Sequence, residues 1–199
     1  MTHPPAPARA DAPERDGRRR RGQDSRARIV AAMLDLVREG DPSPGAEVVA
    51  TRADVGLRTV FRHFQDMDSL YREMSLAIER EIRAIMAQPL QCPPGPARVV
   101  ELIGRRAQAF ETIAPFRRAA EAFRHRSKFL GTDYARMITQ LRAILERELP
   151  PEVARDPLKL EALDLLLSFE AWARLRREQA LSADQAKAVL ESAARALIA

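Results

Sequence analysis

Cysteine and aromatic residues are scarce in this 199-residue sequence, which has one cysteine, Cys92, and an aromatic content of 5%. A single thiol cannot form an internal disulfide, which favours a reducing compartment and an inert Cys92. Apolar runs of membrane-spanning length are missing. Prolines and arginines occupy the N-terminus, where a secretory signal would be apolar. We therefore expect a cytoplasmic protein with no membrane partner.

The sequence also lacks the motifs of common catalytic and metal sites. His3, His63 and His125 stand far apart, without His-x-x-x-His or Glu-x-x-His spacing. A Walker loop, a dinucleotide-binding glycine motif and a cysteine cluster are missing as well. We therefore expect no metal, no cofactor and no enzymatic activity.

Strand-type alternation of valine, isoleucine and threonine is absent, and the helix formers alanine, leucine, arginine and glutamate dominate. Hydrophobic residues make up 46% of the chain, which is enough for a packed core. The periodicity predicts an all-α protein of about nine helices.

Residues 24–64 predict three helices, and the last two form a helix-turn-helix. The first is expected at 24–39, where apolar residues recur on one face and Gly40 follows. The other two are expected at 44–53 and 57–64, with a tight turn at 54–56. Residues 23–69 are therefore the predicted DNA-binding domain.

The helix expected at 57–64 has two unlike sides. The cationic and hydrogen-bonding side consists of Arg58, Thr59, Arg62 and His63. The apolar side, expected to anchor the helix, consists of Val60, Phe61 and Phe64. Arginine can bond both acceptors of guanine, and threonine offers a methyl and a hydroxyl, so we assign base reading to Arg58, Thr59 and Arg62. Thr51 and Arg52 are candidates for contacts with the DNA backbone.

Six arginines and one acid, Asp24, fall between positions 18 and 28, whereas the whole chain has a net charge of only +5. Residues 1–22 are rich in proline, arginine and alanine and are predicted to form a disordered arm. Arg20 and Arg21 of this arm are candidates for contacts with phosphate or the minor groove. A solvated charge run is the alternative.

Residues 70–199 are predicted to form a second domain, connected through a helix at about 66–87. Four prolines and a glycine follow at 88–96 and mark an internal boundary. Further helices are expected at 96–113, after Pro115, at 133–149, at 157–179 and from Ser182 to about residue 198.

Two sets of side chains in this domain are candidate sites. The candidate wall and polar anchors of an effector pocket are Phe110, Ile113, Phe123, His125, Met137, Leu141, Phe169, Glu170 and Trp172. The candidate dimer interface, on the last two helices, consists of Leu163, Leu166, Leu167, Val189, Leu190, Ala193 and Leu197. For both sets, ordinary packing in the core of one chain is the alternative.

The motifs of residues 28–70 resemble the TetR (tetracycline repressor-like) family of transcriptional regulators. The resemblance is carried by Arg28-Ile29-Val30-Ala31-Ala32, Gly40, Val49-Ala50, Ala53-Asp54-Val55, Thr59-Val60-Phe61-Arg62-His63-Phe64 and Asp68-Ser69-Leu70. The sequence departs from the family pattern at Gly56, Phe61 and Met67, where the family often has serine, tyrosine and lysine. Residues 169–176 and the last helix resemble the family's paired dimerisation helices more loosely.

The resemblance implies a homodimeric repressor that binds a palindromic operator in double-stranded DNA. It implies that His63 donates to a phosphate; a packed structural histidine is the alternative. It also implies that a small apolar or amphipathic effector, not identified by the sequence, binds the second domain and releases the DNA. A helical interaction protein of the same fold with weak or lost DNA binding is the alternative.

Overall fold

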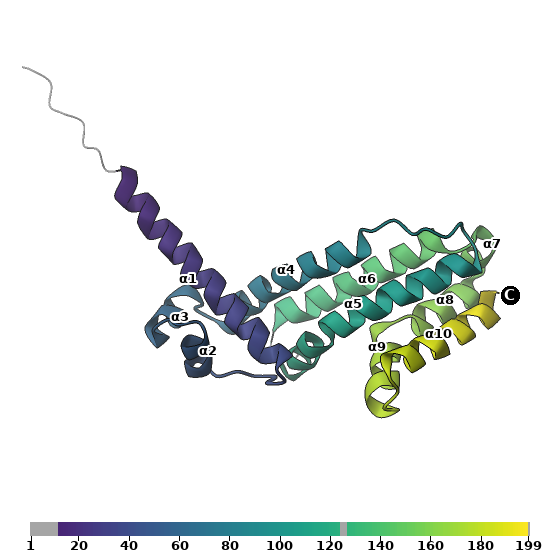
Figure 1. The fold of residues 1–199 in the computed structure, drawn as a ribbon. Helices are drawn as coiled ribbons and strands as arrows, with labels where there is room; N and C mark the ends of the chain where they lie inside the picture. The colour runs from purple at the N-terminus through teal and green to yellow at the C-terminus, as the bar shows by residue number, and fades with distance from the viewer. Residues whose placement is uncertain (1–11, 124–126, 199) are drawn as a thin grey trace, which may run out of the picture. The chain divides into compact units, whose positions relative to one another are not determined.

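The computed structural model describes residues 12–123 and 127–198, and every regular element within these ranges is helical (Figure 1). This confirms the all-α prediction. The chain divides into two compact units, one ending at Leu70 and the other beginning at Tyr71. None of the described helices combines the length and apolar character needed to span a membrane.

The first unit contains α1 (Ala12–Arg38), α2 (Ala46–Arg52) and α3 (Leu57–His63). The expected start of the first helix at Asp24 was wrong, because α1 already begins at Ala12. Residues 12–22, assigned from the sequence to a disordered arm, are thus helical, while residues 1–11 lie outside the described residues. Alanine and arginine are good helix formers, and lengthening an existing helix costs far less than starting one.

Apolar side chains from all three helices close the core of the first unit. Ile29 and Met33 of α1, one helical turn apart, are buried, and so are Val49 of α2 and Val60 of α3. The turn between α2 and α3 passes through Asp54, whose φ of 51° is left-handed. The backbone oxygen of Asp54 accepts a hydrogen bond of 3.2 Å from Arg28, which ties this turn to α1.

The second unit contains most of α4 (Met67–Met86) and the remaining helices. These are α5 (Pro96–Phe123), α6 (Lys128–Glu148), α7 (Pro151–Ala154), α8 (Pro157–Leu166), α9 (Phe169–Ala173), the π-helical segment η1 (Arg174–Glu178) and α10 (Ala183–Ile198). In Figure 1, α4, α6 and α5 run side by side, and α10 lies beside both α5 and α8.

Two expectations for the second unit were wrong. Pro115 was expected to separate two helices, but α5 runs through it. Ile113 and Phe116 are buried on either side of the proline, and this packing offsets the backbone hydrogen bond that proline cannot make. The single helix expected at 157–179 is broken after Leu166 into α8, α9 and η1.

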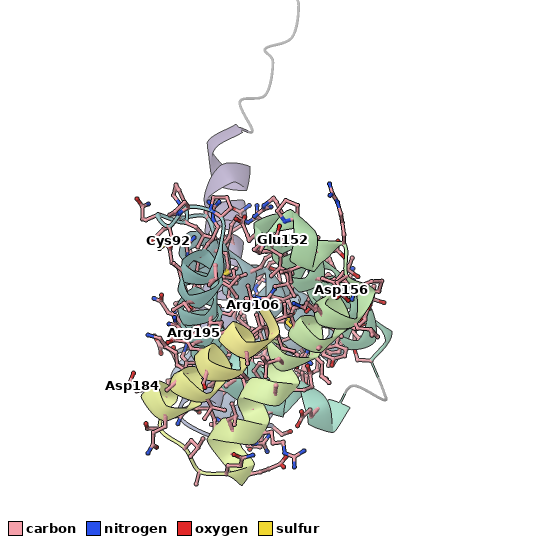
Figure 2. The ribbon with its side chains drawn as sticks, turned by 90° about the vertical axis from the view of Figure 1, so that its right-hand side faces the viewer. Cys92, Arg106, Glu152, Asp156, Asp184 and Arg195 are labelled. Atoms are coloured by element: carbon pink, nitrogen blue, oxygen red, sulfur yellow. The ribbon has the colours of Figure 1, made fainter. Side chains whose placement is uncertain are left out.

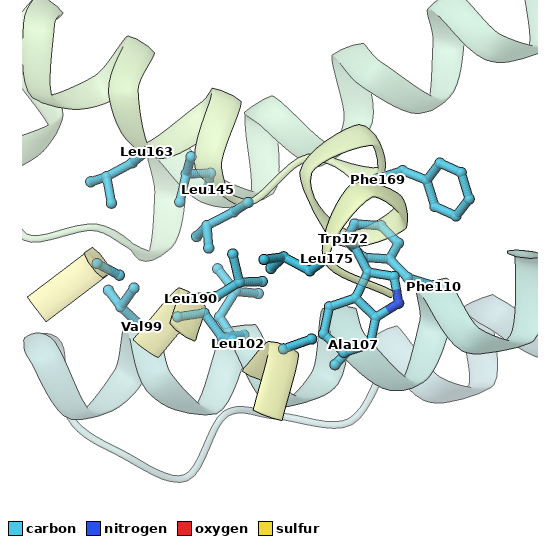
Figure 3. Packing of buried hydrophobic residues seen from close by; sticks show 14 of the residues in the cluster. Val99, Leu102, Ala107, Phe110, Leu145, Leu163, Phe169, Trp172, Leu175 and Leu190 are labelled. Atoms are coloured by element: carbon cyan, nitrogen blue, oxygen red, sulfur yellow. The ribbon is translucent and has the colours of Figure 1, made fainter. Parts of the chain in front are cut away.

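The core of the second unit is built around α5 (Figure 3). Val99, Leu102 and Phe110 of α5 are buried against Leu145 of α6 and Leu190 of α10. The segment α9 adds Phe169 and Trp172, and the ring of Phe110 meets the ring of Phe169 edge to face, with 5.6 Å between the centroids.

Candidate nucleic-acid interface and ligand cavity

The outward side of α3 carries two arginines that pair with no acid in the described part of the chain. Arg58 and Arg62 are exposed and four residues apart, so their side chains leave the same face of the helix. Within the described residues neither forms an ion pair, and α3 itself contains no acidic residue. The unit therefore presents uncompensated positive charge on a short, fixed helix.

Apolar side chains on the opposite side of α3 hold the helix against the rest of the first unit. Val60 and Phe64 are both 5% exposed and anchor the helix to the core, as predicted. Phe61 was expected to join them, and this was wrong: its side chain is 60% exposed. Since residue 61 is three positions after Arg58 and four after Leu57, it shares their face rather than that of Val60.

Thr59 is half-buried at the start of α3, where the N-cap is Gly56. Its backbone nitrogen donates to the oxygen of Gly56 over 2.7 Å, and no side chain of the described residues caps the helix. Gly56 stands where the TetR pattern has serine, so this position caps α3 through its backbone alone.

His63 is half-buried at the end of α3. Its Nε2 is buried with no hydrogen-bond partner in the described part of the chain, and a Cβ on Gly22 would lie 4.0 Å from its Cε1. Burial, together with the charges of Arg62 and Arg26, lowers the pKa of His63 below its usual value. The imidazole therefore lies beside Gly22 of α1, in surroundings that disfavour its charged form.

The two candidate residues on α2 are already engaged. Arg52 donates to both carboxylate oxygens of Glu39, over 2.7 and 2.8 Å, and this pairing raises the pKa of Arg52. The hydroxyl of Thr51 donates to the backbone oxygen of Glu47. Arg20 and Arg21 belong to α1, and the structure describes only their backbone.

A cavity of about 160 Å³ lies within the second unit. Apolar side chains of α4, α5 and α6 form most of its wall: Met74, Ile78, Ile82, Ile113, Phe116 and Met137. A charged cluster lines it as well, in which Arg136 pairs with Asp133 over 2.5 Å and approaches Glu79 at 3.8 Å. The cavity combines an apolar wall with a few polar groups, which is typical of small-molecule sites.

The predicted pocket residues are spread over several places. Ile113 and Met137 line the cavity. Leu141, Phe169 and Glu170 instead line a separate open hollow of about 320 Å³. Phe110 and Trp172 belong to the core, where the indole nitrogen of Trp172 donates to Glu111 over 2.9 Å. The side chain of Phe123 and all of His125 fall outside the described residues.

Sequence reasoning missed the contribution of α4 to the cavity. Met74, Ile78 and Ile82 recur every four residues, and this stripe was visible in the sequence as the apolar face of a connector helix. The stripe alone could not show that α5 and α6 leave space in front of it.

The predicted dimer residues are also divided. Leu163, Leu167 and Leu190 are at most 3% exposed in the single chain, so they complete its core rather than an outer surface. Leu166, Ala193 and Leu197 are half-buried, and Val189 is exposed. The sequence analysis did not single out Leu158 and Leu165, which are the most exposed large apolar residues of α8.

Metal ligands are not gathered anywhere in the described ranges, where no group of three or more histidine, cysteine, aspartate or glutamate side chains could hold an ion.

Two solved structures share this fold. One is SCO7518 from Streptomyces coelicolor A3(2), named as a candidate transcriptional regulator, with 22% identity and a TM-score of 0.61 over 87% of this chain and 98% of that one. The other is EbrR, named as a multidrug binding protein and solved with imidazole, with 18% identity and a TM-score of 0.62 over 87% and 94% of the two chains. No protein-family model and no curated protein matches the sequence. The chain therefore has the fold of these two proteins.

Proposed function

We propose that this chain is a TetR-like transcriptional regulator that binds double-stranded DNA through α3 and responds to a small molecule. The observation that carries the proposal is the pair of exposed arginines, Arg58 and Arg62, which have no ion pair within the described residues. They lie on a helix that follows a tight turn and is anchored by Val60 and Phe64. A cationic helix held in this way suits the major groove.

The cavity between α4, α5 and α6 is the proposed effector site. Its apolar wall and its charged cluster suit a small amphipathic molecule. The naming of EbrR as a multidrug binding protein supports a ligand of this kind. An effector that binds more tightly to the DNA-free protein must weaken DNA binding by the same factor. We therefore propose a repressor that leaves its operator when the effector binds.

The active species is proposed to be a homodimer on a palindromic operator. Leu158 and Leu165 are 83% and 72% exposed and seven residues apart on α8, so they face the same way. Val189 is exposed on α10, next to the small residue Ala188. Exposed leucines beside a helix that permits close approach are suited to a symmetric helical interface.

Enrichment of bound fragments from random duplex DNA and from the source genome tests the proposal. We expect a recurring palindrome, and we expect Arg58→Ala to cost ~1–3 kcal/mol of binding free energy and to relax the preference at one base pair of each half-site. Arg155→Ala, which removes an exposed arginine from the second unit, should leave binding unchanged. If no duplex is enriched over competitor DNA, the chain is instead a helical interaction protein of this fold.

A further inference from the structure

The recognition side of α3 displays an apolar surface that the arginines alone do not explain. Phe61 is 60% exposed and Leu57 is 37% exposed, and they are neighbours four residues apart on the helix. Phe61 and Leu57 therefore add a small apolar surface to the side of α3 that carries Arg58 and Arg62.

The charge around Phe61 decides what it contacts. Arg58 and Arg62 flank it, and neither is neutralised by an acid of the described chain. An apolar or cationic protein surface would leave both arginines buried without partners, which is costly. The major groove of DNA offers negative charge, guanine acceptors and one apolar group, the 5-methyl of thymine.

We propose that Phe61 reads a thymine by packing its ring against the 5-methyl group, which makes it a specificity-determining residue of the operator contact. This inference rests on the proposed function. Val60 and Phe64 hold the helix from behind, so the ring of Phe61 remains on the side of the arginines.

The helix geometry also places this thymine relative to a guanine. Side chains three or four residues apart on a helix lie about 5–6 Å from each other. Base pairs rise by about 3.4 Å per step along one strand. A thymine under Phe61 is therefore expected one or two base pairs from the guanine contacted by Arg58 or Arg62.

The test replaces each thymine of the enriched operator by deoxyuridine, which lacks only the methyl group. At one thymine in each half-site the affinity of the wild-type protein should fall about fourfold, the equivalent of losing one buried methyl-sized contact. Phe61→Ser should bind the thymine and uracil duplexes equally, while Phe61→Leu should keep part of the difference. Leu76→Ser, at an exposed leucine of α4, should behave as wild type.

The outcomes separate this inference from the proposed function. A protein that binds its operator but shows no uracil effect at any position overturns the role of Phe61 and leaves DNA binding intact. The proposed thymine contact is also wrong if Phe61→Ser lowers the affinity for every DNA sequence equally and still binds the uracil duplex more weakly than the thymine duplex. If Phe61→Ser alters self-association in sedimentation but not DNA affinity, the ring serves a protein contact and the inference is wrong. Unchanged thermal unfolding of Phe61→Ser excludes loss of the fold as the cause.

Discussion

The guanidinium of Arg106 donates to the backbone oxygen of Leu167 over 2.8 Å, at the point where α8 ends. Arg106 is 2% exposed and lies in the interior of the second unit (Figure 2), where a further hydrogen bond of 2.5 Å joins it to the backbone oxygen of Leu141. The last carbonyl groups of a helix have no partner within the helix. Arg106 therefore satisfies a helix end that is buried away from water.

Replacing Arg106 by methionine should destabilise the second unit. The carbonyl of Leu167 would stay buried without its donor, and leaving such a group unsatisfied costs about 1–3 kcal/mol. Burial lowers the pKa of Arg106 to about 10, so the side chain remains charged at pH 7 and makes charge-assisted hydrogen bonds. Urea unfolding of Arg106→Met beside Arg155→Met, an exposed control, measures the effect. Equal midpoints for both variants would show that the helix end does not depend on Arg106.

The sequence predicted one long helix at 157–179 because the interactions that break it, including the hydrogen bond from Arg106, are not visible in the local pattern. The apolar pattern continues through positions 166–169, so periodicity gave no sign of a stop. The break depends on Ser168, whose hydroxyl accepts from the nitrogen of Ala171 and caps α9, and on a partner 61 residues away. Local patterns revealed the helices, whereas this long-range hydrogen bond could not be read from them.

Helix α3 shows the same contrast between local and long-range signals. Its bounds and its inward Val60 and Phe64 followed from local periodicity. The outward position of Phe61 did not, because a seven-residue helix is too short for hydrophobic character alone to tell anchor from surface. The engagement of Arg52 by Glu39 likewise depends on how α1 meets α2.

Glu101 should control the reactivity of Cys92. Its carboxylate accepts the backbone N–H groups of Gln91 and Cys92, each over 2.9 Å, and these donors lower the pKa of Glu101. Burial and Glu101 raise the pKa of the Cys92 thiol. Glu101→Gln should loosen this loop and lower the thiol pKa, so alkylation of Cys92 at pH 8 should become severalfold faster. Because Cys92 is the only cysteine, the labelled fraction reports it directly. An unchanged rate would contradict this role of Glu101.

Gly56→Ser should stabilise the first unit by about 0.5–1 kcal/mol. Gly56 has φ −68° and ψ 145°, which any residue can adopt, and it is the N-cap of α3. Serine can accept a hydrogen bond from the first turn and restricts the unfolded chain. Gly40→Ser provides the contrast, because its φ of 108° penalises a side chain although no atom of the described residues lies within 4 Å of the added Cβ. Thermal unfolding should therefore shift in opposite directions, and a shared direction would argue against capping.

His63 should make the stability of the first unit depend on pH. Burial lowers its pKa in the folded state, so the unfolded chain binds the proton more readily. This contribution is fully present above the unfolded pKa of about 6.5 and is lost as the pH falls below it. Between about pH 7.5 and 5 the wild-type melting temperature should fall further than that of His63→Gln. His3 and His125 remain in both proteins and serve as the internal control. If the melting temperatures of the two proteins fall equally with pH, groups other than His63 cause the pH dependence.

The exposed leucines of α8 provide a direct test of the proposed dimer. Burying two leucine side chains contributes about 1.5–3 kcal/mol each, so a symmetric interface that contains Leu158 and Leu165 from both chains draws much of its stability from them. The double variant Leu158→Glu/Leu165→Glu places a cluster of like charges there and should be monomeric by sedimentation.

Leu76→Glu, at a leucine that is 48% exposed on α4, is the control for an added surface charge. Both variants should keep the helical content of wild type, because none of the three leucines belongs to the core. A wild-type protein that is monomeric at micromolar concentration would contradict the dimer itself. A double variant that remains dimeric would instead move the interface away from α8. If DNA affinity falls only in the monomeric variant, the two half-sites are read by one dimer, since each chain offers a single α3.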